Sequence, residues 1–200
     1  MAGDKSVGST ILVNDSVLAP GNALRSMILR QASERDALAI ATLHADSWRS
    51  AYRGILSDDY LANRAPSDRL AAWRDRFAAS ATRPMFVLVA ETGNRLDAFA
   101  CVFPQEDPVF GSFLDNLHVA PQRTGQGIGK LLLAESASYL LRMDKPTGLY
   151  LWVLEQNKRA RRFYARAGAS EVETKVLSMP DGGRHPEVRC YWPDPAHLLL

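Results

Sequence analysis

Three glycines join a strand-like segment to a helix-like segment, and this junction constrains the fold more than any other feature. The first segment, residues 114–119, carries apolar residues and ends at Pro121, which stops a strand. The second begins at Ile128 and continues with Leu131 and Leu132, three and four residues later, as in a helix. The glycines at the junction are Gly125, Gly127 and Gly129. Because glycine leaves the N–H groups at a helix start open to an anion, the junction predicts a phosphate cradle.

The spacing of these glycines argues against two common nucleotide-binding loops. A Walker loop needs a glycine, four further residues and then Gly-Lys-Ser/Thr, whereas this chain has Thr124 in place of the first glycine and Leu131 after Lys130. A Rossmann loop needs Gly-x-Gly-x-x-Gly, and here Gly125 and Gly127 are followed by Lys130. A tight turn that binds nothing is the alternative, but three glycines cost backbone entropy that a simple turn does not require.

The segment around Val119 resembles the signature of the GNAT superfamily of acyl-CoA N-acyltransferases. That signature is a strand ending in Val-x-Pro, followed by Arg/Gln-x-x-Gly-x-Gly/Ala at the start of a helix. Val119 and Pro121 set the register, so that Gly127 and Gly129 fall on the signature glycines and Thr124 replaces the usual Arg or Gln. The resemblance implies that the strand backbone holds the pantetheine arm and the loop holds the pyrophosphate of acetyl-CoA. The residues it assigns to this cosubstrate are Leu117, His118, Val119, Thr124, Gly125, Gln126, Gly127, Ile128, Gly129 and Lys130.

A second segment, residues 151–168, is typical of a strand followed by an amphipathic helix. Its apolar helical residues recur at i, i+3, i+4 and i+7, namely Ala160, Phe163, Tyr164 and Ala167. Asn157 lies seven residues before Tyr164 and therefore almost in line with it along the helix. The segment resembles the second GNAT motif, Asn-x-x-Ala-x-x-Phe-Tyr-x-x-x-Gly. This implies that Asn157 contacts the cofactor arm and that Tyr164 protonates the leaving thiolate; a tyrosine that only packs against coenzyme A is the alternative.

The implied reaction is direct attack of a neutral primary amine on the acetyl thioester, which requires a proton acceptor. An alkylammonium has a pKa of about 10.4, so only about one molecule in a few thousand is neutral at pH 7. The family often uses a glutamate six residues before the valine of Val-x-Pro, and Phe113 stands there in this chain. Asp115 and His118 on the same strand are the remaining catalytic candidates, with a structural role as the alternative for each. Strand alternation places Asp115 on the face of Leu117 and His118 on the other.

The acceptor pocket is expected to contain aromatic side chains. The substrate-binding candidates are Trp48, Tyr52 and Phe113, although aromatic residues on helices are more often part of the core. The acceptor itself is expected to be an amine of a small molecule or peptide. A non-catalytic acyl-CoA-binding or sensing module is a second hypothesis, which Phe113 keeps open and which intact Asn157 and Tyr164 disfavour. A phosphate-binding fold unrelated to coenzyme A is a third.

The order of predicted elements is strand, two or more helices, three strands, helix, strand, helix and two strands. It matches the GNAT α/β plan, so we expect a mixed, mostly antiparallel central sheet of six to seven strands flanked by helices. Residues 27–192 are expected to form one domain, with an extension over 1–26 and a C-terminal tail over 193–200. Ser33–Asp36 has the spacing of a capping box before the first helix. Two short helices are expected over 57–61 and 68–79, and a loop over 104–108.

Composition limits the classes of partner. The net charge of +2 gives no indication of nucleic-acid binding, and no apolar run is long enough to span a membrane. The start of the chain lacks the apolar core of a signal peptide, and the two cysteines favour reduced thiols over a disulfide framework. We therefore expect a cytoplasmic protein without a metal, and a homodimer is a further possibility because the family often forms dimers.

Overall fold

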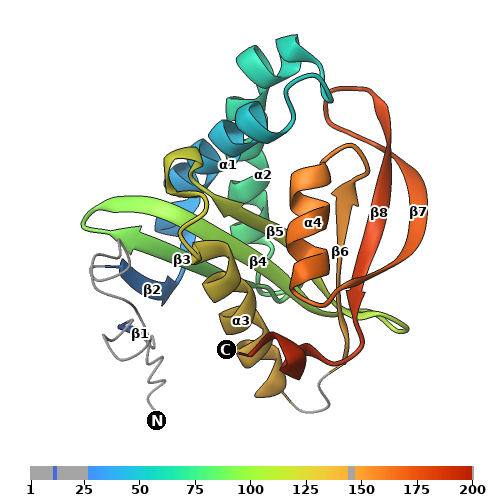
Figure 1. The fold of residues 1–200 in the computed structure, drawn as a ribbon. Helices are drawn as coiled ribbons and strands as arrows, with labels where there is room; N and C mark the ends of the chain where they lie inside the picture. The colour runs from blue at the N-terminus through green and yellow to red at the C-terminus, as the bar shows by residue number, and fades with distance from the viewer. Residues whose placement is uncertain (1–10, 13–26, 144–146, 200) are drawn as a thin grey trace.

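One mixed sheet organises the computed structural model, which describes residues 11–12, 27–143 and 147–199 (Figure 1). The strands are β1 (Ile11–Leu12), β2 (Met27–Gln31), β3 (Phe86–Thr92), β4 (Arg95–Asp107), β5 (Gly111–Val119), β6 (Leu149–Leu154), β7 (Ser170–Ser178) and β8 (Arg184–Trp192). They lie in the order β1-β2-β3-β4-β5-β6-β8-β7, and all neighbours pair antiparallel except β5 and β6. The predicted mixed, mostly antiparallel sheet is confirmed, with seven main strands and the two-residue β1 added at one edge.

Helices cover both faces of this sheet. Figure 1 shows α1 (Ala37–Ala51) and α2 (Ala65–Ala78) on one face, and α3 (Ile128–Leu141) and α4 (Lys158–Arg166) on the other. Alternate residues of β4 contribute to two separate cores. Ala98, Ala100 and Val102 pack on the α3 side. Phe99, Cys101 and Phe103 pack on the α1–α2 side. A strand buried on both faces needs a near-continuous apolar run, and β4 has one.

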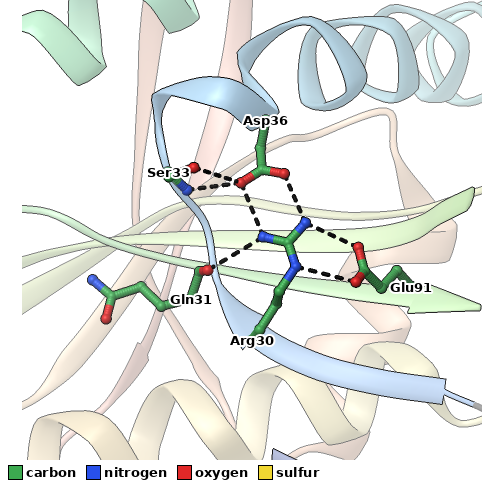
Figure 2. Close-up of polar contacts among 5 residues, drawn as sticks. All are labelled: Arg30, Gln31, Ser33, Asp36 and Glu91. Carbon is green, nitrogen blue, oxygen red and sulfur yellow. Dashed lines mark hydrogen bonds and ion pairs between the residues drawn. The ribbon is translucent and has the colours of Figure 1, made fainter. Parts of the chain in front are cut away.

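The first helix is fixed to the sheet by the guanidinium of Arg30 on β2 (Figure 2). Arg30 donates to both carboxylate oxygens of Asp36 at 2.9 and 2.7 Å, and to Glu91 on β3 at 3.1 and 2.9 Å. Asp36 also accepts from the backbone N–H of Ser33 at 2.8 Å, as a capping box requires. These hydrogen bonds, from Arg30 first and then Ser33, hold the pKa of Asp36 below its usual value. The predicted helix start is confirmed, and it is tied to two strands as well.

The helical region after α1 differs from the prediction of two short helices over 57–61 and 68–79. The structure has one continuous helical segment from residue 58 to residue 78, with a π-helical stretch at Tyr60–Arg64 leading into α2. Pro66 has no N–H to donate to a preceding carbonyl. The carbonyl of Leu61, five residues earlier, accepts from Arg49 Nε at 3.1 Å instead. The predicted break was wrong because the helix widens before the proline and a side chain from α1 satisfies the freed carbonyl.

Two further segments are more ordered than the sequence indicated. The loop predicted over 104–108 is mostly strand, since β4 continues to Asp107 with a register irregularity after Phe103 and a positive φ of 51° at Gln105. The predicted C-terminal tail contains a 3-10 helix, Pro195–Leu198, and Leu198 packs into the core that also contains α3. Most of the predicted 1–26 extension lies outside the described residues. Within the described ranges, no helix is long and apolar enough to cross a membrane.

Candidate active site

The site begins where β5 and β6 part. The two strands pair in parallel only at Ser112–Leu149 and Phe113–Tyr150, and they diverge beyond this point (Figure 1). A cavity of about 560 Å³ lies there, between the free edge of β5, β6, the end of α1, the first turn of α3 and α4. From Leu114 onward β5 has a strand partner on its β4 side only. Backbone N–H and C=O groups on its other edge can therefore bind an extended ligand arm.

One end of the cavity is built to receive an anion. Gly125 and Gly127 have φ values of +80° and +83°, a left-handed conformation that residues with a Cβ rarely adopt. No heavy atom lies within 4 Å of a Cβ built at either position, so the backbone there is open rather than packed. Four cationic side chains also line the cavity, namely Arg123, Lys130, Arg159 and Arg166. Open backbone at the N-terminus of α3, with these cations, fits the pyrophosphate of coenzyme A.

Arg123 is held in place by a fully buried carboxylate. Asp97 on β4 accepts hydrogen bonds from Thr92 Oγ1 at 2.7 Å and Arg95 Nε at 2.8 Å, and its Oδ2 lies 3.3 Å from Arg123 Nε. Its backbone carbonyl accepts from the N–H of Ala120 at 2.8 Å. Asp97 therefore ties the segment that leads into the glycine loop to the middle of the sheet.

At the inner part of the cavity, α4 presents Asn157 and Tyr164, which both line it. Asn157 caps the helix, since its Oδ1 accepts from the N–H of Ala160 at 3.1 Å. Burial, then the nearby Tyr52 and Cys190, raise the pKa of Tyr164 well above its ordinary value. The hydroxyl of Tyr164 therefore stays protonated at neutral pH and is available as a hydrogen-bond donor. Tyr52, directly after α1, also lines the cavity.

Asp115 lies at a β-bulge, which changes the face predicted for it. Opposite Cys101 and Val102 of β4 stand Asn116 and Leu114, so Asp115 is the extra residue of β5. Arg76 of α2 lies 2.6 Å from Asp115 Oδ2 and donates to Asn116 Oδ1 at 2.7 Å. The prediction that Asp115 shares the face of Leu117 was wrong, because the bulge interrupts strict alternation. Asp115 lines the cavity with its carboxylate already paired.

His118, near the end of β5, faces α1. Its Nδ1 lies 2.8 Å from Ser47 Oγ, and its ring packs against His44 and Phe99 with centroid separations of 4.5 and 5.2 Å. Burial, then the charge of Arg69, lower the pKa of His118 to about 3. The imidazole is therefore neutral at physiological pH and has a weak affinity for a proton.

Most of the residues proposed from the sequence meet at this cavity. Those that line it are Tyr52, Asp115, Leu117, His118, Val119, Thr124, Gly125, Gly127, Ile128, Gly129, Lys130, Asn157 and Tyr164. Trp48, Phe113 and Gln126 are outside its lining. Trp48 is buried in a cluster with Leu56 and Tyr60, and Phe113 stacks on Tyr150 at 5.0 Å. Ser47, Arg123 and Trp152 were not proposed from the sequence, and Arg159 was predicted to lie on a mostly solvated helix face; Arg123 flanks the first motif, so its proximity was the available signal.

No group of three or more His, Cys, Asp or Glu residues in the described part of the chain is arranged to hold a metal ion. The cavity lining, with cationic side chains, a free strand edge and a tyrosine hydroxyl, fits a nucleotide-linked arm such as that of coenzyme A.

Comparisons with known proteins agree with this geometry. The acetyltransferase (GNAT) family matches residues 41–169. The uncharacterized N-acetyltransferase YuaI of Bacillus subtilis is 30% identical over 168 residues, which cover 83% of this chain and 92% of that protein. A probable N-acetyltransferase of Mycobacterium tuberculosis is 29% identical over 140 residues, covering 69% of this chain and 76% of that protein.

Solved structures share the fold at lower identity. The PaiA N-acetyltransferase of Thermoplasma acidophilum, in complex with coenzyme A, has a TM-score of 0.62 at 20% identity and covers 84% of this chain and 99% of that one. A spermidine N-acetyltransferase chimera of Vibrio cholerae SpeG and hSSAT has a TM-score of 0.63 at 17% identity, covering 86% and 98%. Family match, relatives and cavity together show that the chain belongs to the GNAT family and is an acetyl-CoA-dependent N-acetyltransferase.

Proposed function

We propose that the acceptor is a primary amine of a small molecule or peptide, and that it attacks the acetyl thioester directly. The observation that carries this proposal is the cavity at the parting of β5 and β6, which brings a cationic end and the Tyr164 hydroxyl into one continuous space. In the described residues both cysteines, Cys101 and Cys190, are buried and unpaired, and neither lines the cavity. Direct attack, rather than an acetylated cysteine, fits this arrangement.

The proposed roles follow from where each group lies. The amides of the glycine loop, with Lys130 and Arg123, bind the pyrophosphate. The free edge of β5 at Leu117–Val119 binds the pantetheine arm, and the N–H of Val119 donates to the oxygen on which negative charge develops. Bound acetyl-CoA supplies the acetyl thioester. Tyr164 donates a hydrogen bond to the sulfur, which stabilises a leaving thiolate whose ordinary pKa is about 8.5.

The experiment that tests this proposal has two stages. Calorimetric titration of the purified chain with acetyl-CoA is expected to show binding. A panel of amines, comprising spermidine, agmatine, aminoglycosides, amino acids and lysine-containing peptides, is then scanned for release of the coenzyme A thiol. Spermidine is included because a structural neighbour is a spermidine N-acetyltransferase. Binding of acetyl-CoA without turnover of any amine would point to a non-catalytic sensing module.

Cellular location and assembly are separate proposals. The two buried, unpaired cysteines support a reducing, cytoplasmic setting. A homodimer is proposed on the ground that β7 is an edge strand of the sheet and exposes Val172 and Val176. Size-exclusion chromatography with light scattering measures the oligomeric state directly.

A further inference from the structure

Glu187 on β8 is a buried carboxylate beside the cavity that the roles above leave unused. It stands opposite Leu154 of β6 in an antiparallel register, and residues opposite each other project from the same face of a sheet. Leu154 packs with Trp48 and Leu56 on the α1–α2 side, and Tyr52 packs against that cluster. Glu187 therefore faces the side of the sheet on which Tyr52 lines the cavity. It is 9% exposed, and its carboxylate makes no hydrogen bond or ion pair within the described ranges.

The cationic side chains that lie nearest to Glu187 in the strand register pair with another carboxylate, so they do not neutralise Glu187. Lys175 stands opposite it on β7, but Nζ of Lys175 pairs with Glu173 at 2.7 Å. Arg189, the next residue of β8 on the same face, pairs with Glu173 at 3.0 Å and stacks over the ring of Trp152 at 4.6 Å. Trp152 lines the cavity, so this face of β8 continues from its wall. Glu187 is not itself among the residues that line the cavity, but Tyr52, Asp115 and Trp152, which surround it, are.

The other titratable groups near Glu187 come from three elements. His185 lies on its own strand, Asp115 on β5 and Tyr52 after α1. Burial, opposed by His185 and reinforced by the charge of Asp115, raises the pKa of Glu187. Burial first, and then the charge of Glu187, raise the pKa of Tyr52. An unpaired carboxylate that has lost most of its water is destabilising unless a cation reaches it.

We propose that Glu187 binds the ammonium group of the acceptor and accepts the proton that the amine must lose before it attacks. This inference rests on the proposed function and names both the substrate class, a primary alkylammonium, and the base. Asp115 is a weaker candidate because its carboxylate is engaged by Arg76 at 2.6 Å. His118 is a weaker candidate because its Nδ1 is engaged by Ser47 and its pKa is about 3.

The proton and bond changes balance without a further reactant. An N–H bond of the ammonium breaks as an O–H bond forms on Glu187. The neutral amine then forms a C–N bond to the acetyl carbon and the C–S bond breaks. The nitrogen loses a second proton as the amide forms, and the leaving thiolate takes up one proton, relayed by the Tyr164 hydroxyl, to become the thiol. Glu187 returns its proton to water when the product leaves. A base with a raised pKa suits this task, since proton transfer is most effective when the pKa of the base approaches the working pH.

The first test measures binding, so it does not depend on turnover. The full chain is saturated with coenzyme A and titrated with spermidine and with propylamine by calorimetry, comparing wild type with Glu187→Gln. We expect Glu187→Gln to weaken amine binding by about tenfold or more while the affinity for coenzyme A changes less than about twofold, as for loss of one charge-assisted contact. Glu135→Gln on α3, on the other face of the sheet, is the matched control and is expected to bind as wild type.

The second test is the pH dependence of kcat/KM with spermidine. In wild type kcat/KM is expected to rise with pH through the pKa of Glu187, because only the carboxylate form accepts a proton. Glu187→Gln is expected to lose this limb and about 100-fold in kcat/KM. Glu187→Asp, which keeps a carboxylate, is expected to retain the limb with an intermediate rate. Asp115→Asn is expected to keep the limb as well.

The outcomes separate this inference from the proposed function. Wild type that does not bind coenzyme A contradicts the proposed function. Wild type that binds coenzyme A but neither amine, or Glu187→Gln that binds both amines as wild type does, overturns the role of Glu187 alone. Loss of the pH limb in Asp115→Asn but not in Glu187→Gln would assign the base to Asp115. If Glu187→Gln does not fold, Glu187→Asp decides, and wild-type amine affinity and rate in that variant count against the inference.

Discussion

Oδ2 of Asp97, which is fully buried in β4, lies 3.3 Å from Nε of Arg123, which precedes the glycine loop. Twenty-five residues of chain separate them along β4, the following turn and β5, so the pair is a tertiary tie. Asp97 thus positions Arg123 at the anion-binding end of the cavity, although Asp97 itself does not line the cavity.

Asp97→Asn is therefore expected to impair both folding and cofactor binding. It removes the buried carboxylate that Arg95 and Arg123 contact, which should cost about 1–3 kcal/mol in the free energy of unfolding. Urea unfolding and calorimetric titration with coenzyme A measure the two effects. Asp46→Asn is the control, because Asp46 is half exposed and its pair with Arg49 is worth about 0–1 kcal/mol. Equal stability of the two variants would show that the buried pair contributes little.

Gly127→Glu is expected to abolish binding of coenzyme A. The new carboxylate would stand at the pyrophosphate position, and φ of +83° would add strain of about 1–3 kcal/mol. Gly182→Glu, at φ +86° in the turn between β7 and β8, is matched in backbone conformation and equally free of neighbours. It is expected to show similar strain with unchanged affinity. If Gly127→Glu still binds coenzyme A, this loop is not the phosphate-binding site.

Tyr164→Phe is expected to lower kcat by about 100-fold, the lower range for loss of a group that acts as a general acid. Acetyl-CoA affinity should change little, because the ring that packs beside the arm remains. Turnover and calorimetry on the same preparation separate the two effects. Tyr139→Phe on α3, where the ring stacks on Phe86 at 3.8 Å, provides the control and should leave kcat unchanged. An unaltered kcat in Tyr164→Phe would reduce Tyr164 to a packing role.

Asp36→Asn is expected to reduce the acid dependence of stability. The pKa of Asp36 is lower in the folded chain than in the unfolded chain, so its contribution is present above the unfolded pKa, about 3.9, and is lost as pH falls through the folded value. Wild type should therefore lose stability more steeply than the variant below about pH 4. Urea unfolding across this range measures the slope. Asp75→Asn, at an exposed position of α2, should follow wild type.

Local sequence information was sufficient for the elements whose signals are local. The apolar spacing of residues 128–132 located α3, the capping box at Ser33–Asp36 located the start of α1, and Asn157 marked the cap of α4. All but one of the residues that the two motifs assign to the site line the cavity, because glycines and helix caps are required by backbone geometry at fixed positions.

The remaining features depend on partners far along the chain. The bulge at Asp115 exists only relative to β4, so strand alternation alone predicted the wrong face for that side chain. Trp48 and Phe113 were expected at the acceptor, but packing with Leu56 and Tyr150 determines where their rings point. Glu187 lies within β8 and carries no motif, and the role proposed for it follows from the register of β8 with β6.

The two cysteines have a practical consequence for assays. Cys101 lies in the core between β4 and the α1–α2 layer, and burial raises its thiol pKa; burial also raises the pKa of Cys190 to about 11. The thiolate is the form that reacts with disulfide reagents, and both protein thiols are almost entirely protonated near neutral pH. A colorimetric disulfide reagent added to the native protein therefore reports newly released coenzyme A, and an early burst of protein-derived colour would signal unfolded chains in the sample.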